Sequence, residues 1–338
     1  MSEPPAISPT DASQPVTLVP ETFSGTLLRR LRYAAAVALS ALLMGTVGLY
    51  AAGPPASVAG MSLLIWPGHM VLLSLLVLAL LLLLATAIGA LLCHPDSPHQ
   101  GLWCALLGLV ALSVRGGTSL MIIRSGQLAG PDAYASICHT LALECVYWTV
   151  LFLIAEMFAR LLHDRFLPNT RWITRISPEA GAKMVRAKLA GPADVATRVS
   201  FPLARPAARF NLPTPLAGLL AFLLAMIVGC LLLALTLQSQ EKGQVVAACF
   251  FSFLAAAFIA GAAFPNVPAL VLFLAVPATA VVGYLYAAGY PGVYPGHAGS
   301  VFPRALPIDF FAAGIPGAIS GYYAAFHVAL HSSVEEKA

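Results

Sequence analysis

Apolar residues in this chain gather into eight long stretches that are separated by short polar segments. A helix of about 20 residues crosses the roughly 30 Å hydrocarbon core of a bilayer, whereas a β-barrel would show short segments of alternating polarity. The pattern predicts an all-α, polytopic integral membrane protein with about eight transmembrane helices. These are expected at about 33–52, 68–93, 101–123, 135–161, 215–238, 245–264, 268–289 and 308–331.

The overall composition excludes a soluble globular protein. Of the 338 residues, 59% are hydrophobic and 9% are charged, whereas soluble domains carry roughly 25% charged residues. The formal net charge is +4, but it is not accompanied by a basic face with aromatic residues, which nucleic-acid binding would require. We therefore expect the chain to contact the lipid bilayer and not nucleic acid.

The Arg and Lys residues lie mainly on one side of the expected spans. Cytoplasmic loops carry an excess of these residues, so both termini are predicted to be cytoplasmic. The abundance of Ala, Gly and Pro, with more Arg than Lys, indicates a bacterial protein of the cell inner membrane. The basic side holds Arg29, Arg30, Arg32, the segment 160–209 and Lys337, and the other side holds Arg124, Lys242 and Arg304.

One long polar segment divides the spans into two sets of four. The predicted organisation is a disordered cytoplasmic tail at 1–30, four spans within 31–161, a basic cytoplasmic linker at 162–213, four spans within 214–331 and a cytoplasmic tail at 332–338. Within the linker, Ser177-Pro178-Glu179 is typical of a helix start. That helix is either an interfacial helix on the inner leaflet or an ordinary linker helix.

Two ionisable residues lie deep inside neighbouring spans, where such groups are costly and usually have a role. At 1.5 Å per residue, Arg115 lies about 12 Å and Glu144 about 13–14 Å from the same outer face. A short loop makes the two helices antiparallel neighbours, so an ion pair between Arg115 and Glu144 is predicted. With His139 it forms a gate, proton relay or anion site; alternatively, the pair is a structural pin that fixes helix register.

Two other charged positions have local explanations. Glu156 and Arg160 are four residues apart, which predicts an ion pair along one helix face. Asp309 lies where the last span is expected to begin, near the outer face. It either joins a site there or is an acid in a first helical turn, which the helix dipole favours.

Histidine and cysteine residues form two groups that could ligate a metal ion. The outer group is His69, His139 and His297, and three imidazoles can hold a metal with an open fourth position. Two of these histidines end the strings Trp66-Pro67-Gly68-His69 and Tyr294-Pro295-Gly296-His297. Such strings are typical of turns at the membrane interface, which is our interpretation, with a metal site as the alternative.

The inner group consists of Cys93, His94, His99 and Cys104. Thiolate and imidazole are zinc ligands, but neither the C-x-x-C nor the H-E-x-x-H spacing is present. We interpret the group as a polar hairpin between two helices, with a metal site as the alternative. No other cofactor is predicted.

The last span carries a motif for close helix packing. Gly317-x-x-x-Gly321 allows another helix to approach closely, and Pro316 starts or kinks the helix. The alternative interpretation of these three residues is a hinge.

No enzyme signature is present: there is no G-x-S-x-G motif and no Gly-rich phosphate loop. Five of the spans carry only scattered polar groups, so any polar centre is expected between the third, fourth and eighth spans. We therefore expect a non-catalytic subunit or assembly partner of a larger inner-membrane complex. The alternatives are an ion- or proton-coupled transporter of small solutes and a membrane-embedded metalloenzyme.

Overall fold

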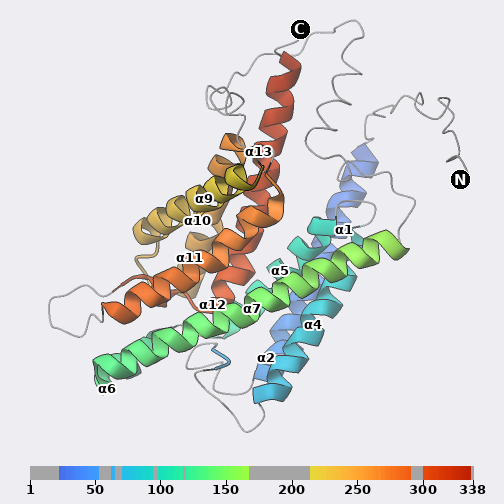
Figure 1. The fold of residues 1–338 in the computed structure, drawn as a ribbon. Helices are drawn as coiled ribbons and strands as arrows, with labels where there is room; N and C mark the ends of the chain where they lie inside the picture. Colours follow the sequence, from blue (N-terminus) through green and yellow to red (C-terminus); the bar gives the residue numbers. More distant parts are fainter. Residues whose placement is uncertain are drawn as a thin grey trace, which may run out of the picture.

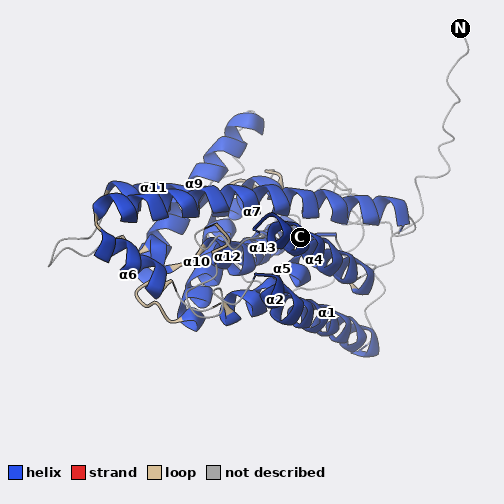
Figure 2. Ribbon diagram, turned by 90° about the horizontal axis from the view of Figure 1, so that it is seen from below, coloured by secondary structure: helices blue, strands red, loops and turns tan. Residues whose placement is uncertain are grey.

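The fold is an assembly of helices (Figure 1). The structure is a computed structural model, and it describes residues 23–52, 62–64, 71–93, 98–116, 119–166, 214–265, 267–290 and 300–335. Within these residues the regular elements are all helical, and none is a strand (Figure 2).

The described residues of the first half of the chain form four long helices and three short elements. A π-helical turn, η2, continues α1 into α2, so that the three form one rod. The elements are α1 (Phe23–Leu43), η2 (Met44–Gly48), α2 (Leu49–Ala52), α4 (Val71–Leu92), α5 (Pro98–Arg115), α6 (Leu120–Ala129) and α7 (Pro131–Phe166).

The second half also contains four long helices. A second π-helical turn, η7, leads from the short α12 into the last helix. The elements are α9 (Thr214–Thr236), α10 (Lys242–Ala263), α11 (Ala269–Gly289), η6 (Phe302–Arg304), α12 (Pro307–Asp309), η7 (Phe310–Gly314) and α13 (Ile315–Glu335).

Six of the described helical segments are long and apolar enough to cross a membrane. Large apolar side chains on their outer surfaces are exposed, for example Leu72 and Leu80 on α4 and Met157 on α7, as lipid contact requires. The chain is therefore consistent with a polytopic helical membrane protein. The six segments are Leu27–Ala51, Leu72–Leu92, Pro131–Leu162, Pro215–Thr236, Lys242–Ala263 and Ala269–Gly289.

The helix α7 joins the two halves of the chain. It packs against α4 and α5 of the first half and against α11 and α12 of the second, and it extends along the width of the molecule in Figure 2. Its 36 residues correspond to about 54 Å at 1.5 Å per residue. A single element thus carries side chains to both groups of helices.

Small residues bring helices of the first half into close contact. A Cβ atom on Gly89 of α4 would lie 2.3 Å from the carbonyl oxygen of Gly101 on α5. A Cβ atom on Gly108 of α5 would lie 2.3 Å from the Cβ of Ser40 on α1. Because lipid tails are as apolar as the side chains, such close backbone packing drives helix association in membranes.

The helix ends differ from the predicted boundaries. α1 begins at Phe23 and carries Arg29 and Arg30, so the helix begins inside the tail predicted at 1–30. α7 and α13 continue to Phe166 and Glu335, because extending a formed helix adds one hydrogen bond per residue. The rest of the linker, 167–213, lies outside the described residues, as does its expected helix.

The third predicted span, 101–123, is divided between two helices. α5 ends at Arg115 and α6 begins at Leu120, with Gly116 immediately after the end of α5. Glycine is a poor helix former because it loses more backbone freedom than other residues. The break places Arg115 at the end of a helix and not in its interior.

Candidate functional site

The carboxyl group of Glu144 is held by a non-helical segment that reaches into the helix assembly. Glu144 lies on α7 and is fully buried. Its Oε2 accepts hydrogen bonds from the Ser62 hydroxyl at 2.5 Å and the Leu63 backbone N–H at 3.0 Å. The Leu64 N–H lies 3.5 Å away, and the indole N–H of Trp148 donates to Oε1 at 3.3 Å. Four donors thus surround this carboxyl group.

Arg115 is directed toward a different part of the protein. Its Nη1 donates a hydrogen bond of 2.8 Å to the carbonyl oxygen of Gly45, which lies in the π-helical turn η2. Such turns interrupt the regular i→i−4 ladder, which makes a carbonyl available to an outside donor. The predicted contact between Arg115 and Glu144 is therefore absent: Arg115 ends α5 facing η2, whereas Glu144 takes its partners from Trp148 and 62–64.

His139 lies on a different face of α7 from Glu144. Five residues along a helix correspond to a rotation of about 140°, and His139 is exposed whereas Glu144 is buried. With Asp132, Ser136 and Thr140, it lines an open groove on the outside of α7. The structure therefore does not bring His139 together with Glu144 or Arg115.

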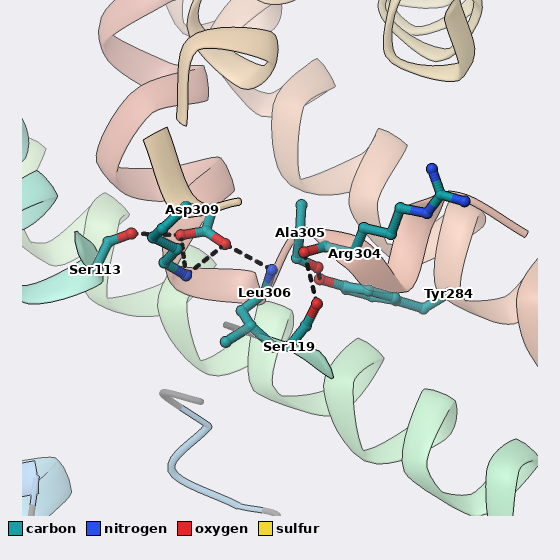
Figure 3. A network of polar contacts seen from close by, with 8 residues as sticks. Ser113, Ser119, Tyr284, Arg304, Ala305, Leu306 and Asp309 are labelled. Carbon is teal, nitrogen blue, oxygen red and sulfur yellow. Dashed lines mark hydrogen bonds and ion pairs between the residues drawn. The ribbon is translucent and has the colours of Figure 1, made fainter. Parts of the chain in front are cut away.

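A second buried carboxylate, Asp309, connects both halves of the chain (Figure 3). Lys242, the first residue of α10, places its Nζ 2.7 Å from Oδ1 and donates a hydrogen bond of 2.9 Å to Oδ2. The Ser113 hydroxyl of α5 donates to Oδ1, and the Leu306 backbone N–H donates to Oδ2 at 2.8 Å. The side chain of Asp309 is 0% exposed and that of Lys242 is 9% exposed, so this ion pair is shielded from solvent.

The segment that precedes Asp309 is fixed to three neighbouring parts of the fold, and Figure 3 shows the contacts to Ser119 and Tyr284. The Ser119 hydroxyl donates to the Arg304 carbonyl at 2.7 Å, and the Tyr284 hydroxyl donates to the Ala305 carbonyl at 2.7 Å. The Arg304 Nη1 donates to the carbonyls of Leu237 and Gln238 at 2.9 and 2.6 Å. These carbonyls follow α9, where the last helical carbonyls have no partner within the helix.

A third carboxylate, Glu156, lies farther along α7. Arg160 donates from Nε to the Glu156 Oε1 at 2.7 Å, and its Nη2 lies 2.7 Å from the same oxygen. The predicted i,i+4 pair is therefore confirmed. The His99 Nδ1 of α5 lies 3.1 Å from the same Oε1, so Glu156 also connects α5 to α7.

The candidate metal ligands are only partly within the described residues. Cys93 and Cys104 are buried with their Sγ atoms 3.5 Å apart, while His99 contacts Glu156. His94, His69 and His297 lie outside the described residues. Within the described part of the chain, no group of three or more His, Cys, Asp or Glu residues could hold a metal ion.

The glycine motif lies at the contact between α13 and α10. A Cβ atom on Gly317 would lie 2.2 Å from the carbonyl oxygen of Phe250, and one on Gly321 would lie 2.1 Å from that of Leu254. The carbonyl of Pro316 accepts hydrogen bonds from Ser320 at 2.8 Å and from Trp103 of α5 at 3.3 Å. These residues thus hold α13 close to α10 and attach it to α5.

Sequence reasoning missed the partnership between Lys242 and Asp309. In the sequence, Lys242 was interpreted as a loop charge that indicates membrane orientation, and Asp309 as an acid at the start of a helix. The hydrogen bond that Asp309 accepts from the Leu306 N–H agrees with that local role. A signal was present nonetheless. Asp309 is the lone carboxylate of the stretch 308–331, and a buried charge requires a partner. Lys242 lies beside a span end on the same predicted side of the membrane.

Comparisons with known proteins assign no family to the chain. No protein-family model matches it, and neither the curated proteins nor the solved structures contain a match.

Proposed function

We propose that the chain is a non-catalytic integral membrane component, a subunit or assembly partner of a bacterial inner-membrane complex. One observation carries this proposal: each buried carboxylate of the described residues is engaged by protein donors. Glu144 has four such donors, Asp309 has an ion pair and two further hydrogen bonds, and Glu156 binds Arg160 and His99. Asp309 and Glu156 connect helices, and Glu144 connects α7 to the segment 62–64, so none of these three carboxylates is directed at a substrate.

The concave surfaces of the described residues support the same proposal. Ligand sites are usually cavities lined by apolar groups and a few converging polar groups. Two hollows in this part of the chain, of about 400 and 310 Å³, are lined by none of the three buried carboxylates. The polar interior is therefore better suited to holding helices together than to holding a substrate.

We also propose eight membrane crossings with both termini in the cytoplasm. The segments Leu27–Ala51, Leu72–Leu92, Pro131–Leu162, Pro215–Thr236, Lys242–Ala263 and Ala269–Gly289 supply six, and α5 with α6 and α13 would supply the other two. α5 packs against α1 and α4, and α13 packs against α10. The distribution of Arg and Lys supports the orientation.

Purification from native membranes tests the proposed function. In two mild detergents of different head groups, we expect a partner protein to accompany the chain at the same molar ratio in both. Light scattering gives the protein mass of the particle. A homogeneous, correctly folded particle with the mass of a single 35.3 kDa chain in both detergents would contradict the proposal.

A proton-coupled transporter is the second candidate, and the contact of Glu144 with Ser62–Leu64 favours it. A non-helical segment is easier to displace than a helix, and its displacement would expose the carboxyl group. In this case Glu144→Gln abolishes proton flux into proteoliposomes, followed with a pH-sensitive dye, while the protein stays folded. Equal flux in wild type and variant, or no flux in either, would exclude this candidate.

A further inference from the structure

A polar cavity near α6 differs in character from the buried carboxylate network. It has a volume of about 310 Å³ and forms where α6, the start of α7, the connection between α9 and α10, and the segment 300–304 meet. No acidic side chain is among the described residues that line it. Its polar lining consists of Arg124, Gln127, Tyr134, Gln240, Ser300 and Arg304.

The guanidinium group of Arg304 is held in place at this cavity. Its Nη1 donates to the carbonyls of Leu237 and Gln238, and these are the hydrogen bonds that its side chain makes within the described residues. No described residue accepts a hydrogen bond from its Nε or Nη2. A donor that is already oriented loses less freedom when a ligand binds.

Arg124 and Gln127 supply further donors from α6. They are three residues apart and therefore lie on the same helix face. Arg124 is exposed and Gln127 is half-buried. Arg124 and Arg304 give the cavity two positive charges, and Gln127, Gln240 and Ser300 add neutral donors.

This set of donors fits a phosphate group. Guanidinium groups match phosphate and carboxylate oxygens with paired hydrogen bonds. A phosphate offers more acceptor oxygens than the two of a carboxylate, and so suits two guanidinium groups with additional amides and a hydroxyl. Arg and Tyr at helix ends also lie at the level where lipid head groups are found.

We propose that the cavity lined by Arg124 and Arg304 binds a phosphate group, supplied either by an anionic lipid head group or by a free phosphate anion. The site is separate from the buried carboxylates and does not depend on the proposed function of the chain. A lipid head group and free phosphate both present anionic phosphoryl oxygens, so the test distinguishes the two sources by using both.

Binding to the purified full-length chain tests this proposal. At constant ionic strength, the protein in neutral detergent is titrated with inorganic phosphate in one arm and with short-chain phosphatidylglycerol in the other. We expect Arg124→Gln to weaken binding about tenfold or more, as expected for loss of a charged hydrogen bond. Arg30→Gln, an exposed residue of α1, removes the same charge elsewhere and should change affinity less than about twofold.

The two arms identify the source of the phosphate. Arg124-dependent binding of inorganic phosphate indicates a free anion, and Arg124-dependent binding of the lipid alone indicates a head group. Gln127→Leu, which retains the charges of Arg124 and Arg304, should weaken binding about threefold. It tests the site if Arg124→Gln fails to fold. The proposal is overturned if neither probe binds, or if folded variants bind as well as the wild type and the Arg30→Gln control.

Discussion

Among the described residues, the partners of the buried Glu144 carboxyl group are hydrogen-bond donors and none is a cationic side chain. It accepts from a hydroxyl, two backbone N–H groups and an indole, three of them contributed by Ser62–Leu64. The carboxyl group also satisfies the backbone N–H groups of Leu63 and Leu64, because buried N–H groups need hydrogen-bond acceptors. These hydrogen bonds attach the non-helical segment 62–64 to α7.

Removing this acceptor should destabilise the protein. For Glu144→Leu we expect the free energy of unfolding to fall by about 2–4 kcal/mol, because several buried donors lose their partner. Glu144→Gln keeps one acceptor oxygen and should lose about 1–2 kcal/mol. Denaturation in a detergent–SDS titration measures both. His139→Gln, on the exposed side of α7, should change stability by less than about 0.5 kcal/mol, and an equal loss in all three variants would argue against the role given to Glu144.

For single residues, the sequence predicted how deep in the protein a side chain lies, but not which residues it contacts. Glu144 stood out because it is a charged residue within an apolar stretch, and the structure places it in the interior. Its partner Ser62 lies 82 positions earlier, in a segment whose sequence gives no sign that it enters between helices. Arg115 was matched to Glu144 by depth alone, and depth does not specify which way a side chain points around its helix.

Among the helices, α13 and α10 pack with their backbones in close contact at Gly317 and Gly321. The spacing of Gly317 and Gly321 predicted a face for close approach, because residues four apart lie on one side of a helix. The sequence did not identify the neighbour, since any helix with an accessible backbone could occupy that face. The structure supplies the carbonyl oxygens of Phe250 and Leu254 at this position.

A methyl group at either glycine should force these helices apart. We expect Gly317→Ala and Gly321→Ala each to lower the free energy of unfolding by about 1–3 kcal/mol, the usual cost of overpacking. Gly218→Ala on α9 is the matched control, because a Cβ atom there meets nothing within 4 Å and alanine favours helix by up to about 1 kcal/mol. The same SDS titration provides the comparison, and stabilisation at all three positions would refute the close contact.

For the whole molecule, the long polar segment predicted a division into two sets of four helices. It did not predict which residues join the two sets. α7 packs on both sets, and Asp309 takes donors from α5 in one set and α10 in the other. Neither contact has a local signature, because the partners are separated by long stretches of chain. Their positions follow only when all the helices have packed.

The proposed orientation can be tested with single introduced cysteines. Gln238→Cys, exposed after α9, should react with a membrane-impermeant maleimide in intact spheroplasts, because it is predicted to lie outside. Arg30→Cys, exposed on α1, should react only after the membrane is opened. The chain without an introduced cysteine serves as the control for labelling of the six native cysteines. The reverse labelling pattern would contradict the prediction that both termini are cytoplasmic.

The most direct test of the structural role of the buried charges is a double-mutant cycle on Asp309 and Lys242. Asp309→Asn and Lys242→Met should each lower the free energy of unfolding by about 3–5 kcal/mol, because each leaves one buried charge unpaired. The double variant should lose less than the sum of the two single losses, with an interaction energy of about 1–3 kcal/mol. Losses that add to within about 0.5 kcal/mol would contradict a pair that joins the helices of the membrane domain.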